Sequence, residues 1–288
     1  MVSEGHRPAE RVDGVDQLRA QAAQLDGDRA AAREVFQKMA EQPETEMLGL
    51  RGLFLEAKRE HQTEAARLFA ERAMERNPDL AWSVNALFEL QCRASDWDGA
   101  LRTLDVAQRQ KQLDKPVAER RRAVLLTAQA LDAEESDANR ARQLALDAHR
   151  LAPGLVPAAE IAGRIMASQG DATRAAKVLQ KTWELSPHPD LAFTYAHLRP
   201  GDGPHDRLKR VKFLSQWSPD AKEAAIAVAA AAVEARDWTA AREALQPCLD
   251  ARPQARVCTL MARIEGGETG DQGRVREWLA RAGRAPRD

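Results

Sequence analysis

The chain has 288 residues, of which 44% are hydrophobic, 30% are charged and only 5% are aromatic. The 43 Lys and Arg residues almost balance the 44 Asp and Glu residues, so the overall charge gives no reason to expect nucleic acid or an anionic membrane as partner. Few aromatic residues and abundant alanine favour close-packed helices over β-sheets.

Residues 1–16 are polar and lack the apolar stretch of a signal peptide, so we expect a disordered or tag-like N-terminal segment. No apolar run reaches the ~18 residues that span a bilayer. The alanine-rich segment 224–235 comes nearest, and we expect it to be a helix packed on several sides. Cys92, Cys248 and Cys258 lack metal or redox spacing and are expected to be small buried hydrophobes, which is compatible with a reducing compartment.

A spacing of 34 residues organises positions 17–283. It is the period of the tetratricopeptide (TPR) helix–turn–helix repeat, and a small residue at this position lets two helices approach closely. We therefore predict an all-α fold, an α-solenoid of about 7–8 TPR-like helical hairpins that form a superhelix, followed by a tail at 284–288. The spacing relates Ala32 to Ala66 and Ala100, Ala141 to Ala175, and Ala241 to Val275.

Turn and terminator residues recur at fixed places in these units. Glycine and aspartate pairs such as 27–28, 170–171 and 270–271 mark the turn inside a hairpin, and their recurrence indicates turns rather than calcium loops. Prolines that cannot continue a helix end the units. These are Pro43, Pro78, Pro153, Pro187 and Pro253.

The period is broken in two places. Between Ala100 and Ala141 the spacing grows to 41 residues, and either 112–116 or the acidic segment 132–137 could absorb the insertion. The second irregularity is the unit at 188–219. It is predicted to contain a short first helix at 190–198, a Gly/Pro-rich loop at 199–206 and a basic second helix at 207–217.

This irregular unit contains two sets of candidate site residues. His188, His197 and His205 are candidate ligands of a haem iron or a metal, because neutral imidazole is a common ligand, although capping or surface roles are the simpler interpretation. A basic cluster could bind phosphate, acidic lipid or acidic peptide; alternatively it is the solvated face of a helix that pairs with nearby acids. The cluster consists of Arg207, Lys209, Arg210 and Lys212.

A third candidate site is at the start of the third unit. First helices line the inner surface of such arrays, and Trp82 opens one of them, where an aromatic anchor would be a binding hot spot. Asn85 and Gln91 on the same helix could hydrogen-bond an extended peptide.

We find no catalytic signature in the sequence. It has no phosphate loop, no G-x-S-x-G motif, no dinucleotide fingerprint and no paired metal-ligand spacing. We therefore predict a protein that is not an enzyme, with no catalytic residues, no metal and no resident cofactor unless haem binds.

Three segments resemble the TPR region of proteobacterial HemY-type proteins, and the resemblance extends over most of residues 18–288. It implies a non-enzymatic protein that is associated with a late stage of protohaem synthesis, with haem-biosynthetic enzymes as protein partners. In that family two N-terminal helices anchor the domain at the cytoplasmic face of the inner membrane; this chain lacks them, so it is expected to be soluble itself. The resembling segments are 49–105, 190–197 (DLAFTYAH) and 274–288 (RVREWLARAGRAPRD).

Three hypotheses about function follow. The first is a protein-interaction scaffold that organises haem-biosynthetic enzymes. The second is a haem or tetrapyrrole carrier or sensor that uses the three histidines. The third is a lipid-associated or envelope-associated assembly factor whose basic segment contacts anionic lipid.

Overall fold

The computed structural model describes residues 28–218, 220–249 and 252–285. The segment 1–16 and residues 286–288 of the predicted tail are outside this range. The described residues form fifteen α-helices and one 3₁₀ turn, and their contacts divide the chain into two units, the first ending at Arg121 and the second beginning at Arg122. The prediction of an all-helical array of hairpins is confirmed.

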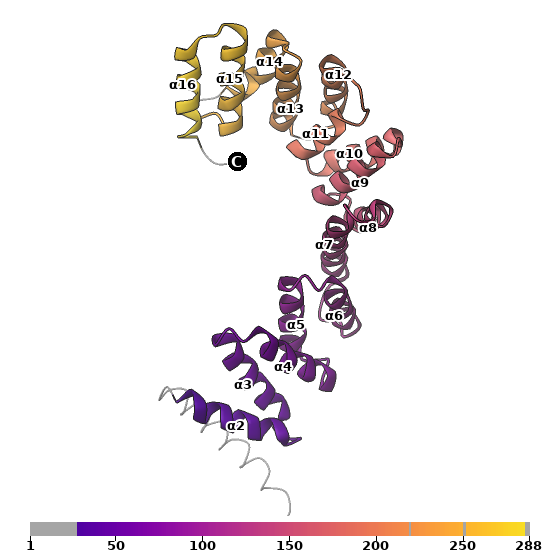
Figure 1. Cartoon of the computed structure of the whole chain (residues 1–288), viewed down its shortest axis with the longest axis vertical. Helices are drawn as coiled ribbons and strands as arrows, with labels where there is room; N and C mark the ends of the chain where they lie inside the picture. The colour runs from indigo at the N-terminus through magenta and orange to yellow at the C-terminus, as the bar shows by residue number, and fades with distance from the viewer. Residues whose placement is uncertain (1–27, 219, 250–251, 286–288) are drawn as a thin grey trace, which may run out of the picture. The chain divides into compact units, whose positions relative to one another are not determined.

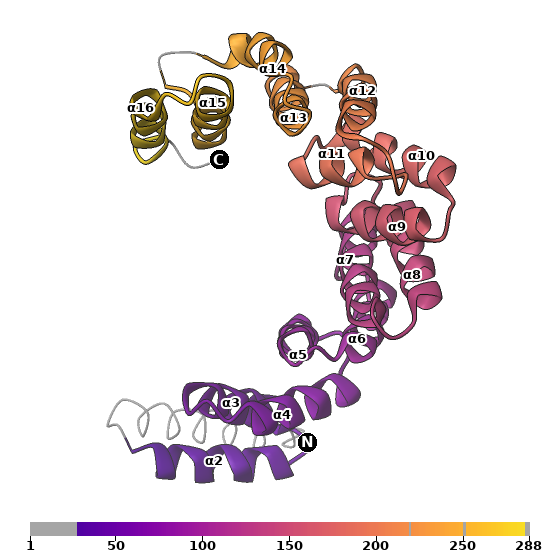
Figure 2. The same ribbon diagram turned by 45° about the horizontal axis from the view of Figure 1, so that its top comes forward.

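The first unit contains α2 to α6 and the start of α7. Each helix packs against the next, from α2 with α3 to α5 with α6, and the succession can be followed in Figures 1 and 2. The helices are α2 (Arg29–Glu41), α3 (Glu46–Arg59), α4 (Thr63–Arg76), α5 (Ala81–Arg93), α6 (Trp97–Arg109) and α7 (Lys115–Ala133).

The second unit continues in the same way. The first helices of successive hairpins in this unit also contact one another: α9 packs on α11, α11 on α13 and α13 on α15. The elements are α8 (Ala138–Leu151), α9 (Val156–Ser168), α10 (Ala172–Leu185), α11 (Pro189–Ala196), α12 (Pro204–Ser215), α13 (Ala221–Glu234), α14 (Trp238–Leu245), η1 (Gln246–Cys248), α15 (Ala255–Glu268) and α16 (Gln272–Ala282).

The alanines of the 34-residue period are the close-contact positions that the sequence predicts. Six of them, from Ala32 to Ala241, are at most 2% exposed, whereas Val275 in the last helix is only half-buried. Larger side chains four residues further on, such as Leu104, Leu179 and Leu245, are fully buried beside them. A small residue at the crossing and a large one a turn later are therefore the local basis of the hairpin.

The carboxylates of the recurring turns are helix N-caps. Asp96 lies four residues before Ala100, and its side chain accepts a hydrogen bond from the Gly99 amide at 2.9 Å. The same cap, on the third amide of the helix, stabilises five other second helices, each by about 1 kcal/mol. Its residues are Asp28, Asp137, Asp171, Asp237 and Asp271.

The residues inserted between Ala100 and Ala141 are mostly in a helix, α7. The predictions that 112–116 or 132–137 absorbs them as a loop are therefore wrong. α7 has 19 residues where other full first helices have 13 or 14, and the connections on either side remain short. Pro116 is the second residue of α7, where the missing N–H is harmless, because the first amides of a helix have no intrahelical acceptor. Asp132 also belongs to this helix rather than to a loop.

An arginine that directly follows the contact alanine joins successive hairpins. Arg67 reaches Asp96 at 2.7 Å, and Arg142 reaches Gln169 at 2.6 Å. Arg33 pairs with Glu60 in the same way. The arginine thus ties the second helix of one hairpin to the internal turn of the next.

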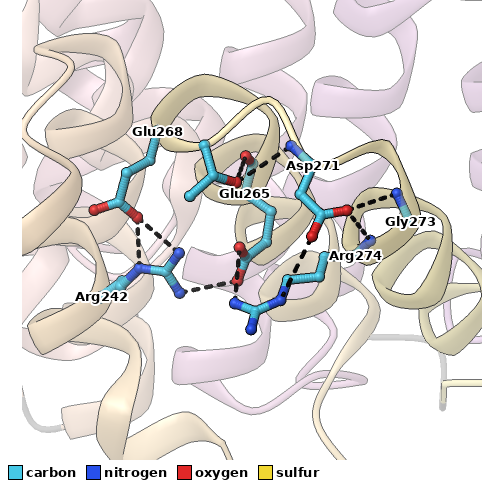
Figure 3. A network of polar contacts seen from close by, with 7 residues as sticks. Arg242, Glu265, Glu268, Asp271, Gly273 and Arg274 are labelled. Atoms are coloured by element: carbon cyan, nitrogen blue, oxygen red, sulfur yellow. Dashed lines mark hydrogen bonds and ion pairs between the residues drawn. The ribbon is translucent and has the colours of Figure 1, made fainter.

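The most buried of these ties is at the C-terminal end of the second unit. Figure 3 shows the Arg242 guanidinium between Glu265 and Glu268, at 2.9 and 2.7 Å. The Glu265 side chain is 3% exposed, and Arg274 lies 3.5 Å from its other oxygen. The hydrogen bond from Arg242 outweighs the effect of burial and lowers the pKa of Glu265. The carboxylate therefore stays ionised inside the array.

The cysteines match their predicted role as buried apolar side chains, with Cys248 and Cys258 buried and Cys92 half-buried, all as free thiols. Burial raises the pKa of Cys92 and of Cys258, which keeps these thiols protonated and unreactive. Among the helices in the described ranges, none combines the length and the apolar character that crossing a membrane requires.

Candidate functional site: an apolar groove between first helices

The irregular hairpin at 188–219 borders an apolar groove of about 380 Å³. This groove lies in the second of the two units, after Arg121. We call it the α11–α13–α15 groove, after the first helices that line it. Six of the side chains that line it are alanines and therefore small. Val211 is the one lining residue that comes from the second helix of a hairpin. The alanines are Ala192, Ala196, Ala227, Ala230, Ala231 and Ala255.

The short α11 helps to shape this groove. It has 8 residues instead of 13 or 14, so both of its ends, Pro189 and His197, line the groove. Phe193 also lines the groove and is 60% exposed, with its ring 4.3 Å from the His197 ring. An exposed aromatic side chain beside small apolar ones is a common anchor for a ligand.

Three charged residues line the groove, Glu223, Glu234 and Arg256. Arg256 binds Glu223 through two hydrogen bonds of 3.0 and 2.7 Å, so this pair is neutral overall. Glu234 is exposed at the C-terminal end of α13 and adds a negative charge to the lining. The groove is thus suited to an apolar ligand with a positive group near Glu234.

The structure places the three histidines differently. His188 caps α11, where its Nδ1 accepts a hydrogen bond from the Asp190 amide at 3.3 Å. His205 is exposed on α12. Only His197 lines the groove, and its Nδ1 donates to the Phe193 carbonyl at 2.8 Å. That bond leaves the Nε2 lone pair of the neutral ring available to a ligand.

The basic segment does not form one cationic cluster. Arg210 is half-buried; it donates to the Ala196 carbonyl at 2.6 Å and pairs with Asp202, so it holds the 197–203 connection against α11. These contacts give Arg210 a structural role, and its role in binding a partner stays a prediction. Arg207 is also half-buried, whereas Lys209 and Lys212 are exposed, with Lys209 3.6 Å from Asp206.

A smaller groove in the first unit contains two of the residues predicted on α5. Trp82 and Asn85 line a space of about 280 Å³ between α3, α4 and α5, and the Trp82 ring packs 5.6 Å from that of Phe54. This groove is more polar, because Lys58, Glu89 and Arg93 also line it.

Gln91 does not take part in that groove. Its side chain is buried, and its Oε1 accepts a hydrogen bond of 2.8 Å from Thr103 on α6. Gln91 thus links the two helices of its own hairpin, and its contact with a bound peptide stays a prediction. A long polar side chain on a first helix can point into a groove or toward the second helix of its hairpin. For Gln91 the packing of α6 decides between the two.

Sequence reasoning missed the α13 part of the site. The alanine-rich segment 224–235 was expected to be packed on several sides, and most of it is, but Ala227, Ala230 and Ala231 line the groove. The available signal was the poor amphipathicity of this segment: a helix without a polar face, next to an irregular unit, has apolar surface to offer a ligand.

Together, the repeat period, the hairpin packing and the groove define the class of protein. It is an α-solenoid of TPR-like helical hairpins with an apolar groove on its first helices.

Comparison with known proteins gives a more particular relationship. The chain is 31% identical over 195 residues to a probable magnetosome protein, Mms48, of Magnetospirillum gryphiswaldense; the match covers 67% of this chain and 43% of that protein. The chain therefore spans less than half the length of this relative. No family model matches the chain.

Two solved structures of repeat proteins align with most of the chain. A tetratricopeptide repeat protein from Parabacteroides merdae shares 12% identity, with 94% of this chain and 99% of that one covered and a TM-score of 0.36. The TPR domain of P58(IPK) shares 15% identity, with 94% and 78% covered and a TM-score of 0.31. These scores are low, so the fold assignment depends on the helices of the chain itself. Nothing in these similarities is specific to HemY-type proteins, and that resemblance stays a prediction.

Proposed function

We propose that the chain is a non-catalytic interaction scaffold whose α11–α13–α15 groove holds an apolar segment of a partner protein. The observation that carries this proposal is the groove itself, in which six alanines and the exposed Phe193 form a continuous apolar lining. Its volume of about 380 Å³ favours a short apolar segment, such as one face of a helix or an extended stretch. The exposed Glu234 favours a partner with a lysine or arginine beside its apolar residues.

Selection of peptides on the immobilised chain tests the proposal. We expect the enriched peptides to carry closely spaced apolar residues next to a basic one. Substituting Ala230→Arg places a charged side chain in the groove, and Phe193→Ala removes its aromatic anchor. Each change should weaken binding of a selected peptide at least tenfold, as measured by fluorescence anisotropy.

Leu68→Ala is the matched control, because Leu68 is 61% exposed on α4 and does not line this groove. It should leave peptide affinity unchanged. Circular dichroism checks that each variant stays folded. Peptides that bind the Ala230→Arg variant as tightly as the unaltered chain would show that this groove is not the binding surface.

The similarities suggest two settings for such a scaffold. The HemY-type resemblance would make haem-biosynthetic enzymes its partners. The similarity to a probable magnetosome protein would make magnetosome proteins its partners. Affinity purification from the native cell, compared with the Ala230→Arg variant, distinguishes the two through the proteins that depend on the groove.

A second candidate function is the binding of haem or another flat tetrapyrrole in the same groove. The observation that favours it is His197, whose ring lies against Phe193 at the edge of an apolar groove with Nε2 free to ligate iron. Neither His188 nor His205 lines this groove.

Haem titration separates this function from the first. If the groove binds haem, a shifted Soret band should appear and should be lost in His197→Ala. The variants His188→Ala and His205→Ala are matched controls and should keep the band. Failure to form a shifted band, or a band that survives in His197→Ala, excludes haem ligation by His197.

A further inference from the structure

The outer face of α12 and the turn directly after it carry two exposed aromatic residues and two exposed lysines. Phe213 is 49% exposed and Trp217, one turn later, is 47% exposed. The opposite face of α12 is buried through Leu208, Val211 and Leu214. Figures 1 and 2 show α12 beside α13 and α11, against which this inner face packs.

This aromatic pair is unusual within the described part of the chain. The exposed large aromatic residues there are Phe193, Phe213 and Trp217, and Phe193 already belongs to the α11–α13–α15 groove. Phe213 and Trp217 line none of the grooves described above. Val211 lines that groove from the inner side of α12, and Phe213, two residues further along the helix, faces away from it.

Lysines accompany the pair on the same surface. Lys209 is exposed four residues before Phe213, a spacing that places both on one face of α12, and Lys212 is exposed three residues after Lys209. Asp206 partly offsets Lys209 at 3.6 Å, and both side chains of this ion pair are well exposed. Arg207 and Arg210 point inward and are not part of this surface. This surface therefore combines two exposed aromatic side chains with two exposed lysines, one of which pairs with Asp206.

We propose that Lys209, Lys212, Phe213 and Trp217 form a docking surface for an anionic lipid membrane. Tryptophan is enriched at the membrane interface, and lysine pairs with lipid phosphate while its methylene stem covers apolar surface. A protein partner is the weaker fit, because stable protein interfaces bury about 800 Å² on each side, more than two side chains supply. Interfacial binding, in contrast, adds small contributions from each aromatic and each basic residue.

Flotation of the full chain with lipid vesicles tests this. We expect it to bind vesicles of equal parts phosphatidylcholine and phosphatidylglycerol reversibly, to be released by salt, and to bind pure phosphatidylcholine far less. The double variant Lys209→Gln/Lys212→Gln should bind roughly tenfold more weakly. Phe213→Ala/Trp217→Ala should also lose most of the binding.

The matched control is Lys38→Gln/Leu68→Ala, which removes one charge and one exposed apolar side chain in the first unit. It should bind as the unaltered chain does. All these positions are exposed, and circular dichroism should show unchanged helix content. Equal binding of charged and neutral vesicles, no binding at all, or equal loss in the control variant would each overturn the proposal.

Quenching by brominated lipid tells which tryptophan enters the interface. The expected result is quenching of tryptophan fluorescence in the unaltered chain that disappears in Trp217→Phe, while vesicle binding persists because phenylalanine keeps the apolar contact. Quenching that continues in Trp217→Phe would place the membrane contact elsewhere and contradict the assignment to α12.

Discussion

Replacing Gly49 by alanine should destabilise the first unit by about 2 to 3 kcal/mol. A Cβ at Gly49 would lie 2.4 Å from the Ala40 amide nitrogen and 2.7 Å from the Phe36 carbonyl oxygen. These are backbone atoms of α2, so they cannot rotate away, and α3 must move outward. The intrinsic preference of helices for alanine, about 1 kcal/mol, offsets only part of that cost.

The loss should be local because each hairpin contacts only its neighbours. Hydrogen exchange of α2 and α3 amides is therefore the sharper measurement, supported by urea unfolding. Gly266→Ala is the matched control: it also lies within a helix, but its Cβ would meet only Val275 at 3.4 Å. We expect that variant to be unchanged or more stable by up to about 1 kcal/mol. Equal exchange in Gly49→Ala and the unaltered chain would refute the close approach of α2 and α3.

Removing the Arg242 side chain should lower the free energy of unfolding at the C-terminal end of the second unit by about 2 kcal/mol. Loss of one partner from a fully buried ion pair costs about 3 to 5 kcal/mol, because the other charge stays desolvated. Arg242 is one-third exposed and Arg274 remains near Glu265, which reduces the effect. Arg242→Ala should accordingly raise hydrogen exchange in α15 and α16.

Arg142→Ala is the matched control, because Arg142 occupies the same repeat position but pairs with the exposed Gln169. Its effect should stay below about 0.5 kcal/mol. The double variant Arg242→Ala/Glu265→Gln should recover part of the loss, since no buried charge remains. If Arg142→Ala and Arg242→Ala are equally destabilised, burial of Glu265 is not the cause.

Lowering the pH should also test the ion pair between Arg242 and Glu265. The pKa of Glu265 lies below its ordinary value of 4.5 in the folded chain, so the ionised carboxylate adds stability at neutral pH. That contribution is lost as the pH falls below 4.5 toward the lowered pKa. The difference in stability between Arg242→Ala and the unaltered chain should shrink in this range. A difference that does not depend on pH would point to lost packing of the arginine stem instead.

Sequence predicted the hairpins well because their signals are local. A contact alanine every 34 residues, an aspartate four residues before it and a proline after the second helix each act within one hairpin. The arginine ties were also visible: Arg33, Arg67, Arg142 and Arg242 each follow a contact alanine directly. Their role in joining hairpins could not be predicted, because the side chains that they bind lie in the next hairpin.

The candidate site was harder to predict. The irregular unit at 188–219 does border the apolar groove, and His197 lines that groove, whereas Arg210 and Gln91 contact a loop and a neighbouring helix. The same residue type can be exposed or buried on a helix, and the partner helix decides which. Gly49 illustrates the same limit, because a glycine within a helix shows its function only when the backbone of α2 lies against it.

By itself the sequence determined that this chain is built from helical hairpins, where most of them begin and end, and where the repeat is irregular. Those properties follow from capping, helix propensity and the spacing of small residues, which act over one or two turns. Only the tertiary structure decided that the extra residues lengthen α7, that six alanines from three helices enclose one apolar groove, and that Phe213 and Trp217 stay exposed. These depend on side chains far apart in the sequence, and their positions follow from how whole helices pack.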